Sequence, residues 1–129
     1  MSMSDDVIRI RNMRFYAYHG LLPEENVLGQ LFEVDVEVFG SFAGWASYGA
    51  DPDVTQIKGA INYPEVVELV DSIVTGERYG LVESIADRAA SAIEERFGVE
   101  KLIVRVRKPS PPVAAQFDGI EVEVTRGFE

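Results

Sequence analysis

QLFEVDVEVFGSF, residues 30–42, alternates apolar and acidic side chains through its centre. Successive side chains of a β-strand point to opposite faces, so the two kinds separate onto two faces. The apolar face carries Phe32, Val34, Val36 and Val38, and the opposite face carries Glu33, Asp35 and Glu37. The stretch is therefore predicted to be a long strand with one face in a core and the other face charged.

Three further stretches alternate in the same way, residues 7–19, 101–108 and 117–126. In the first of them the phase of the alternation changes at Asn12, which predicts a β-bulge. The outward side chains are basic in 7–19 and 101–108 and acidic in 30–42 and 117–126. Opposite charges across neighbouring strands favour pairing of the first stretch with the second, and of the third with the fourth.

Two helices are predicted between the two strand pairs. The first begins after Asn62, a good capping residue, has Pro64 in its first turn, and ends at TGERYG, residues 75–80. The second covers residues 81–97 and stops at Gly98.

Residues 21–29 and 43–62 carry no sustained period and are predicted to be loops. The order of elements is then β-β-α-α-β-β, and no helix connects the two strands of a pair. This order predicts an α+β fold, a four-stranded antiparallel sheet with two helices on its apolar face. We expect residues 1–6 to be disordered and residues 7–129 to form a single domain.

A sheet of four long strands has two exposed edges, which invite aggregation unless they are paired or covered. One solution is a ring of subunits joined edge to edge, a barrel with helices outside and a polar tunnel inside. The alternative is a monomer whose edges are blunted by its loops. We favour the ring, because the second face of the sheet is charged and can line water.

The composition narrows the function classes. The 129 residues include no cysteine and a single histidine, His19. Disulfides, zinc–thiolate sites, iron–sulfur clusters and cysteine nucleophiles are therefore excluded, as is a multi-histidine metal site within one chain. The formal net charge of −10 disfavours nucleic acid as a partner. No stretch has the apolar length of a membrane span or a signal peptide, and we expect a cytoplasmic protein.

Three charged residues could carry acid–base chemistry next to the core. Lys108 continues the inward row of its strand at the strand's end, where burial favours a base or an electrostatic catalyst. The alternative is a strand-end lysine whose ammonium reaches solvent. Glu24 and Glu25 follow the first strand, where carboxylates are usually solvated, although one of them can act in acid–base chemistry if another subunit covers it.

Three other residues have a structural and a functional interpretation. Glu83, in the first turn of the second helix, favourably meets the helix dipole, and a carboxylate there can also receive the two donors of a guanidine-like edge. Tyr63, at the start of the first helix, can pack or can stack on a heterocycle and move a proton. His19 is more often a hydrogen-bonded strand-end residue than a catalyst.

Together these fragments resemble the dihydroneopterin aldolase family. The runs that carry the resemblance are MRFYAYHGLLPEENVLGQLFEVDVEV, INYPEVVELV, LVESIADRAA and VRVRKPSPPVAAQFDGIEVEV. The FYxYHG…EEN…GQ opening and the K-P-x-x-P strand end are the specific parts, and the match covers roughly residues 7–126. The resemblance implies the tunnelling fold, with ββααββ subunits in tetrameric rings that often stack as octamers.

The resemblance also implies the reaction. It is a retro-aldol cleavage of 7,8-dihydroneopterin, without metal or cofactor, that yields 6-hydroxymethyl-7,8-dihydropterin and glycolaldehyde in folate biosynthesis. Epimerisation to dihydromonapterin is a second activity of the family. The alternatives are an enzyme similar to dihydroneopterin triphosphate epimerase and a non-catalytic ring protein that binds pterin.

By the resemblance, the family's catalytic lysine, tyrosine and loop glutamate fall on Lys108, Tyr63 and Glu25. Its pterin-anchoring glutamate falls on Glu83, with the Val82 main chain beside it. The chain departs from the family where D-T-V-x-Y is common and Gly59-Ala60-Ile61-Asn62-Tyr63 stands instead. The threonine contact to the pterin is thereby lost, whereas a backbone contact from Ile61 can survive.

Overall fold

The structure, a computed structural model, describes residues 6–128. The elements follow in the order β1 (Asp6–Ala17), α1 (Pro23–Leu28), β2 (Gln30–Gly40), α2 (Ala43–Gly49), α3 (Tyr63–Gly76), α4 (Val82–Phe97), β3 (Lys101–Lys108) and β4 (Ile120–Arg126).

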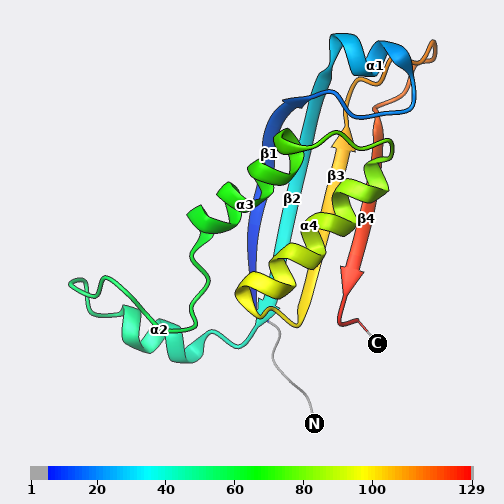
Figure 1. The fold of residues 1–129 in the computed structure, drawn as a ribbon. Helices are drawn as coiled ribbons and strands as arrows, with labels where there is room; N and C mark the ends of the chain where they lie inside the picture. Colours follow the sequence, from blue (N-terminus) through cyan, green and yellow to red (C-terminus); the bar gives the residue numbers. More distant parts are fainter. Residues whose placement is uncertain (1–5, 129) are drawn as a thin grey trace.

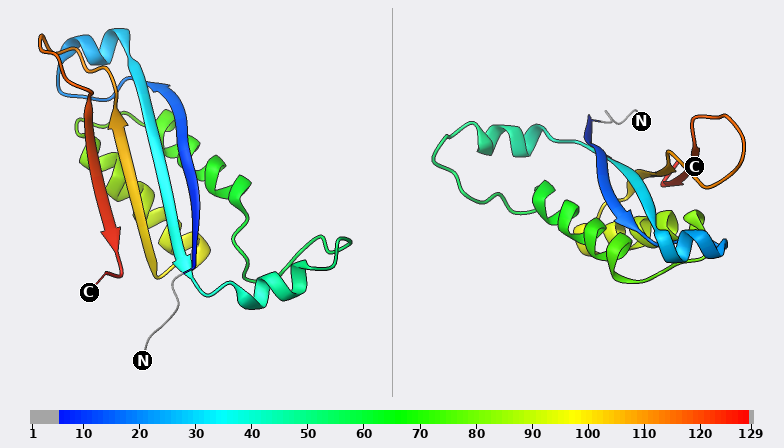
Figure 2. Two further views of the ribbon diagram at one scale, coloured as in Figure 1. Left: turned by 180° about the vertical axis from the view of Figure 1, so that it is seen from behind. Right: turned by 90° about the horizontal axis from the view of Figure 1, so that it is seen from above.

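The four strands form one antiparallel sheet in the order β1-β2-β3-β4. Helices α3 and α4 lie side by side on one face of it, α3 over β1 and α4 over β3 and β4 (Figures 1 and 2). The predicted α+β architecture is therefore confirmed, and β1 and β4 are the two free edges of the sheet in a single chain.

The core lies between this face and the two helices. Each strand contributes the apolar row that its alternation predicts, and α4 contributes a stripe of small and branched side chains. The fully buried members include Phe32, Val34, Val36, Val66, Val70, Ile85, Ala89, Ile93, Leu102, Val104 and Val106. Because Lys108 and Gln30 continue two of these rows at the strand ends, the core extends toward polar side chains at one end of the sheet.

The bulge in β1 lies where the sequence predicts it. The register between β1 and β2 shifts between Ile10 and Met13. Asn12 has φ 57°, and its backbone N–H donates to the Asp35 carboxylate at 2.7 Å. The extra residue moves the inward row from even to odd positions, so that Phe15 and Ala17 still face the core.

The opposite face of the sheet carries a ladder of ion pairs. Arg9 pairs with Glu37 and Arg105 with Glu123, as the outward charges predict. The ladder also crosses the central strands, where Arg107 contacts Asp35 at 2.6 Å. The Arg107 hydrogen bond outweighs burial and lowers the pKa of Asp35. On this face, opposite charges thus meet across each pair of neighbouring strands in the observed register.

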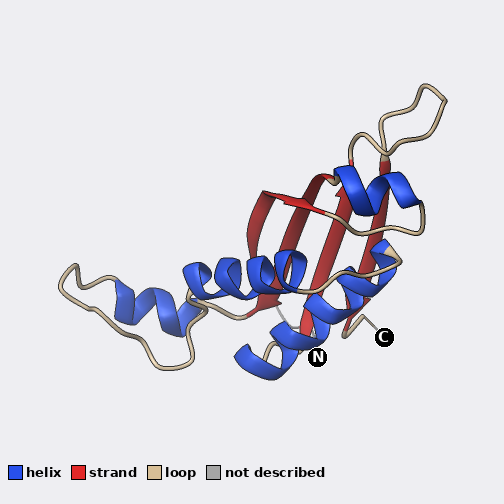
Figure 3. Cartoon of the chain, turned by 45° about the horizontal axis from the view of Figure 1, so that its top comes forward, coloured by secondary structure: helices blue, strands red, loops and turns tan. Residues whose placement is uncertain are grey.

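Two predicted loops contain short helices, α1 and α2. Helix α1 starts with Pro23 in its first turn, which suits proline because that turn has no backbone acceptor for the missing N–H. Helix α2 buries no residue and projects past the β1 edge, away from the sheet (Figures 1 and 3). Phe42 and Trp45 stack at its start, with ring centroids 4.8 Å apart. The predictions of a loop over the whole of 21–29 and over the whole of 43–62 are therefore both wrong.

The prediction of disorder for residues 1–6 is wrong at its last residue. Asp6 belongs to β1, and the rest of the predicted disordered segment lies outside the described residues. Within residues 6–128, no helix has the length and apolar character needed to cross a bilayer.

Candidate active site

Lys108 is the last residue of β3, at the end of the sheet that α1 covers (Figure 1). Burial alternates along β3, and Lys108 falls in the buried row with a relative exposure of 7%. Its ammonium lies 5.8 Å from the centre of the Phe32 ring. The predicted inward orientation is confirmed, and the side chain does not reach solvent at the strand end.

The partner of Lys108 is Glu25 of α1. Lys108 Nζ donates to Glu25 Oε2 at 2.5 Å, and the glutamate is 5% exposed. The sequence led us to expect a solvated loop carboxylate that a second subunit would have to cover. Instead, α1 turns this side chain under the loop within one chain, while the neighbouring Glu24 stays exposed.

Three donors hold the Glu25 carboxylate. Gln30 Nε2 donates to Oε2 at 2.7 Å, and the backbone N–H of Leu22 donates to Oε1 at 3.2 Å. Burial by itself would raise the pKa of this carboxyl, but the hydrogen bonds from Lys108, Gln30 and Leu22 together lower it below its usual value. Glu25 is thus a buried carboxylate in its charged form, beside a buried cation.

Gln30 is a candidate site residue that the sequence reasoning missed. It is 8% exposed and begins β2 directly after Gly29. Its side-chain oxygen is buried and has no hydrogen-bond partner among residues 6–128. The available signal was its position on the even-numbered row of β2, where every other member through Val38 is apolar.

The predicted binding residues Val82 and Glu83 lie at the start of α4. Val82 is buried and Glu83 is exposed in the first turn of the helix. The loop that leads to Glu25 touches the segment before this turn, because the Gly20 N–H donates to the Tyr79 carbonyl at 3.0 Å. The buried ion pair and the start of α4 therefore belong to the same end of the molecule.

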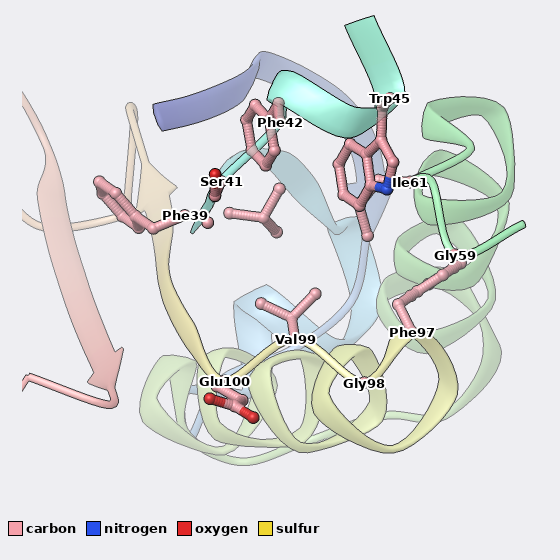
Figure 4. Close-up of a pocket in the computed structure, with 12 residues that line it drawn as sticks. Phe39, Ser41, Phe42, Trp45, Gly59, Ile61, Phe97, Gly98, Val99 and Glu100 are labelled. Carbon is pink, nitrogen blue, oxygen red and sulfur yellow. The ribbon is translucent and has the colours of Figure 1, made fainter. Parts of the chain in front are cut away.

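Tyr63 and Ile61 lie elsewhere. Tyr63 begins α3, which lies over β1, and is 65% exposed. Ile61 lines a separate hollow of about 230 Å³ with Val38 and Trp45 (Figure 4). Arg107, the residue before Lys108, lies opposite Glu33 of β2. Val38 lies five residues farther along β2, and at ~3.4 Å per residue this separates it from Glu33 by about 17 Å. One chain therefore brings Glu25 and Lys108 together but not Tyr63 or Ile61.

Similarity to known proteins identifies the family of the chain. The family model described as dihydroneopterin aldolase matches residues 8–125. The chain is similar to the dihydroneopterin aldolases of Staphylococcus epidermidis and Bacillus subtilis. The first is 38% identical over 95% of this chain and 97% of that protein, and the second 36% identical over 94% and 97%.

A solved structure shares the fold. The Escherichia coli dihydroneopterin aldolase, determined in complex with neopterin, superposes with a TM-score of 0.79 at 24% identity over 95% of this chain and 99% of that chain. Since the family model covers nearly the whole chain and the relatives match over almost their full length, the chain belongs to the dihydroneopterin aldolase family.

Proposed function

We infer that the protein is a dihydroneopterin aldolase, which cleaves 7,8-dihydroneopterin into 6-hydroxymethyl-7,8-dihydropterin and glycolaldehyde. Family membership supports the reaction. The observation that carries the assignment on this chain is the buried contact of 2.5 Å between Lys108 and Glu25. A lysine and a glutamate are the two residue types that the reaction needs at its centre.

The reaction breaks the C1′–C2′ bond of the substrate side chain. The 2′-hydroxyl loses its proton, its oxygen becomes the aldehyde of glycolaldehyde, and the electrons of the broken bond flow into the dihydropterin ring. The ring's imine nitrogen N5 receives them together with a proton. N5 releases this proton as C1′ gains one, which re-forms the imine and gives the hydroxymethyl product. The two products together contain all the atoms of the substrate.

We propose that Lys108 donates the proton that N5 receives. Its ammonium is buried and held by one carboxylate, so it can donate toward a ring nitrogen that gains electron density. Glu25 keeps that donor charged and oriented, and it can hold a water molecule beside it. A Schiff base on the lysine is not required, because the ring itself is the electron sink.

We assign recognition of the pterin to the first turn of α4. The Glu83 carboxylate can accept from the two donors of the aminopyrimidine edge, and the Val82 main chain lies beside it. Neopterin, the ligand of the Escherichia coli relative, carries such an edge. The start of α4 lies at the same end of the fold as Lys108, which supports one ligand spanning both.

We propose that Tyr63 and the Ile61 backbone act on the site of a neighbouring subunit. Tyr63 is largely exposed and lies on the β1 side of the sheet, whereas Lys108 lies on β3. Pairing of β1 of one subunit with β4 of the next would close both free edges into a ring and carry a tyrosine toward the next subunit's lysine. There the phenol can shuttle the 2′-hydroxyl proton.

Stacking of two rings into an octamer is part of this proposal. Exposed large apolar side chains gather on α1 and its flanking segments, at one end of the sheet: Tyr18, Leu21, Leu22, Val27, Leu28 and Leu31. An apolar patch of this kind suits an interface between two rings. Sedimentation should give a multiple of the 14.3 kDa chain mass, and a stable 14.3 kDa species at micromolar concentration would refute the ring.

The activity itself is tested by mixing the purified protein with 7,8-dihydroneopterin. We expect glycolaldehyde and 6-hydroxymethyl-7,8-dihydropterin in equal amounts. Binding of the pterin without release of glycolaldehyde would refute the aldolase and leave a binding protein.

A further inference from the structure

His19 is buried, with 2% exposure, and both of its ring nitrogens are engaged by the backbone. The N–H of Tyr79 donates to Nδ1 at 2.9 Å, and the other nitrogen, Nε2, lies 2.6 Å from the carbonyl oxygen of Val74. A backbone N–H can only donate and a carbonyl can only accept, so the ring carries its single proton on Nε2. The geometry therefore specifies one neutral tautomer.

His19 and Gly20 together hold the Tyr79 residue at both of its backbone groups. His19 accepts from its N–H, and the N–H of Gly20 donates to its carbonyl at 3.0 Å. Tyr79 belongs to the connection between α3 and α4, three residues before Val82. Two neighbouring residues thus position the segment that enters the first turn of α4.

Gly20, the residue after His19, also packs against the Glu25 side of the ion pair. The carbonyl of Gly20 accepts a hydrogen bond from Asn26 Nδ2 at 2.9 Å, and Asn26 directly follows Glu25 in the sequence. A Cβ built on Gly20 would lie 2.2 Å from Glu25 Oε1, so the carboxylate packs directly on this glycine. The contacts form a continuous path from the start of α4 through His19 and Gly20 to Glu25.

We propose that His19 is a positioning residue for the reaction. Through its bond to the Tyr79 N–H, it sets the distance between the pterin-binding turn of α4 and the Glu25–Lys108 pair. This inference rests on the proposed function, because it gives that distance a catalytic meaning. His19 itself touches neither of these two charged side chains by a hydrogen bond.

The first test uses the unchanged protein. His19 is the only histidine in the chain, so its imidazole ¹⁵N signals need no assignment by mutation. We expect the Nε2–H tautomer at neutral pH. A proton on Nδ1, or a charged ring, would overturn the proposal whatever the catalytic activity is.

The second test separates the two hydrogen bonds. His19→Asn keeps an acceptor at the Nδ1 position for Tyr79 but is too short to reach Val74. His19→Gln keeps a donor near the Nε2 position for Val74 but loses the acceptor for Tyr79. If the Tyr79 bond sets the α4 turn, His19→Gln should bind neopterin about tenfold more weakly, whereas His19→Asn should stay within about threefold of wild type.

A purely structural role predicts a different result. Both variants would then unfold at lower temperature, with equal neopterin affinities and equal single-turnover cleavage rates. Val70→Ala is the control, since Val70 is fully buried in α3 one turn before Val74 and makes neither of the two His19 hydrogen bonds, so this variant should lower stability without changing affinity. Equal neopterin dissociation constants for His19→Gln and His19→Asn would overturn the proposal. Inactivity of the unchanged protein would instead contradict the proposed function.

Discussion

Gly20→Ala should uncouple the ion pair without removing either charge. The added Cβ would lie 2.2 Å from Glu25 Oε1 and 2.7 Å from Oε2. Ordinary van der Waals contact begins near 3.4 Å, so the carboxylate must move by about 1.2 Å. Since Oε2 now accepts from Lys108 at 2.5 Å and Oε1 from Leu22 at 3.2 Å, a shift of this size disrupts both hydrogen bonds.

The expected cost has two parts. A misplacement of about 1 Å in a catalytic arrangement lowers the rate by roughly 10²-fold. Gly20 has φ +136°, a backbone conformation that an alanine adopts only with strain, which costs about 1–3 kcal/mol of stability. We therefore expect a folded protein of lower stability whose single-turnover cleavage of 7,8-dihydroneopterin is about a hundredfold slower.

Gly98→Ala is the matched control. Gly98 ends α4 with φ +65°, and no atom lies within 4 Å of the position its Cβ would take. This variant therefore suffers the backbone strain of a left-handed conformation without any contact at the site, and it should lose stability but keep its rate. Wild-type cleavage by a well-folded Gly20→Ala protein would refute the coupling of Glu25 to Lys108 as the basis of activity.

The remaining predictions concern Lys108, Glu83 and His19. Lys108→Ala should slow cleavage by about 10²–10⁴-fold, and Lys108→Arg should rescue it poorly, because a guanidinium differs in shape and stays protonated; near-normal single-turnover rates with an intact circular dichroism spectrum would contradict this role. Glu83→Gln should weaken neopterin binding by about 1.5–3 kcal/mol, because one charge-assisted hydrogen bond is lost, and calorimetry that finds an unchanged dissociation constant would refute the assignment. Burial lowers the pKa of His19 below its model-peptide value of 6.5. The unfolded chain then binds this proton more readily, so urea unfolding should show stability falling as the pH drops below about 6.5. His19→Asn should remove that slope, and a slope that persists in this variant would assign it to another group.

The strand pairing could be predicted from the sequence because the outward charges encode it. Each strand presents one sign of charge at alternate positions, and the register brings Arg9 opposite Glu37 and Arg105 opposite Glu123. The central pairing of β2 with β3 follows the same rule, since Arg107 lies opposite Glu33. The charge signs would fit a pairing of β1 with β4 equally well, so the pattern predicts the two outer pairs but not the order of the whole sheet.

The short helices could not be predicted because they lack the signal that identifies longer ones. Helix α1 has six residues, less than two turns, so no apolar period can develop in it. Helix α2 has seven residues, two of them glycine, and buries none of them in this chain. A helix that buries no residue within its own domain leaves no apolar stripe in the sequence.

Alternation along the strands predicts which polar side chains of the site face the core, but it does not predict which of them contact each other. Lys108 was placed inward because it continues the apolar row of β3, and Gln30 occupies the equivalent position at the start of β2. Both polar residues end an inward row at the same end of the sheet, and that coincidence was visible in the alternation. Their contact with Glu25 was not, because it depends on how α1 turns over the sheet, 83 residues before Lys108 in the chain.

Stability does not explain a buried pair of this kind. At a separation of 2.5 Å and an effective dielectric constant near 20, two unit charges attract by about 7 kcal/mol. Removing each ion from water costs several kcal/mol, so the attraction and the two desolvation penalties nearly cancel. Apolar side chains of similar volume at Glu25 and Lys108 would therefore hold the strand end at least as well. What such side chains could not supply is a charged donor, fixed in position and shielded from water, next to an acceptor that keeps it charged.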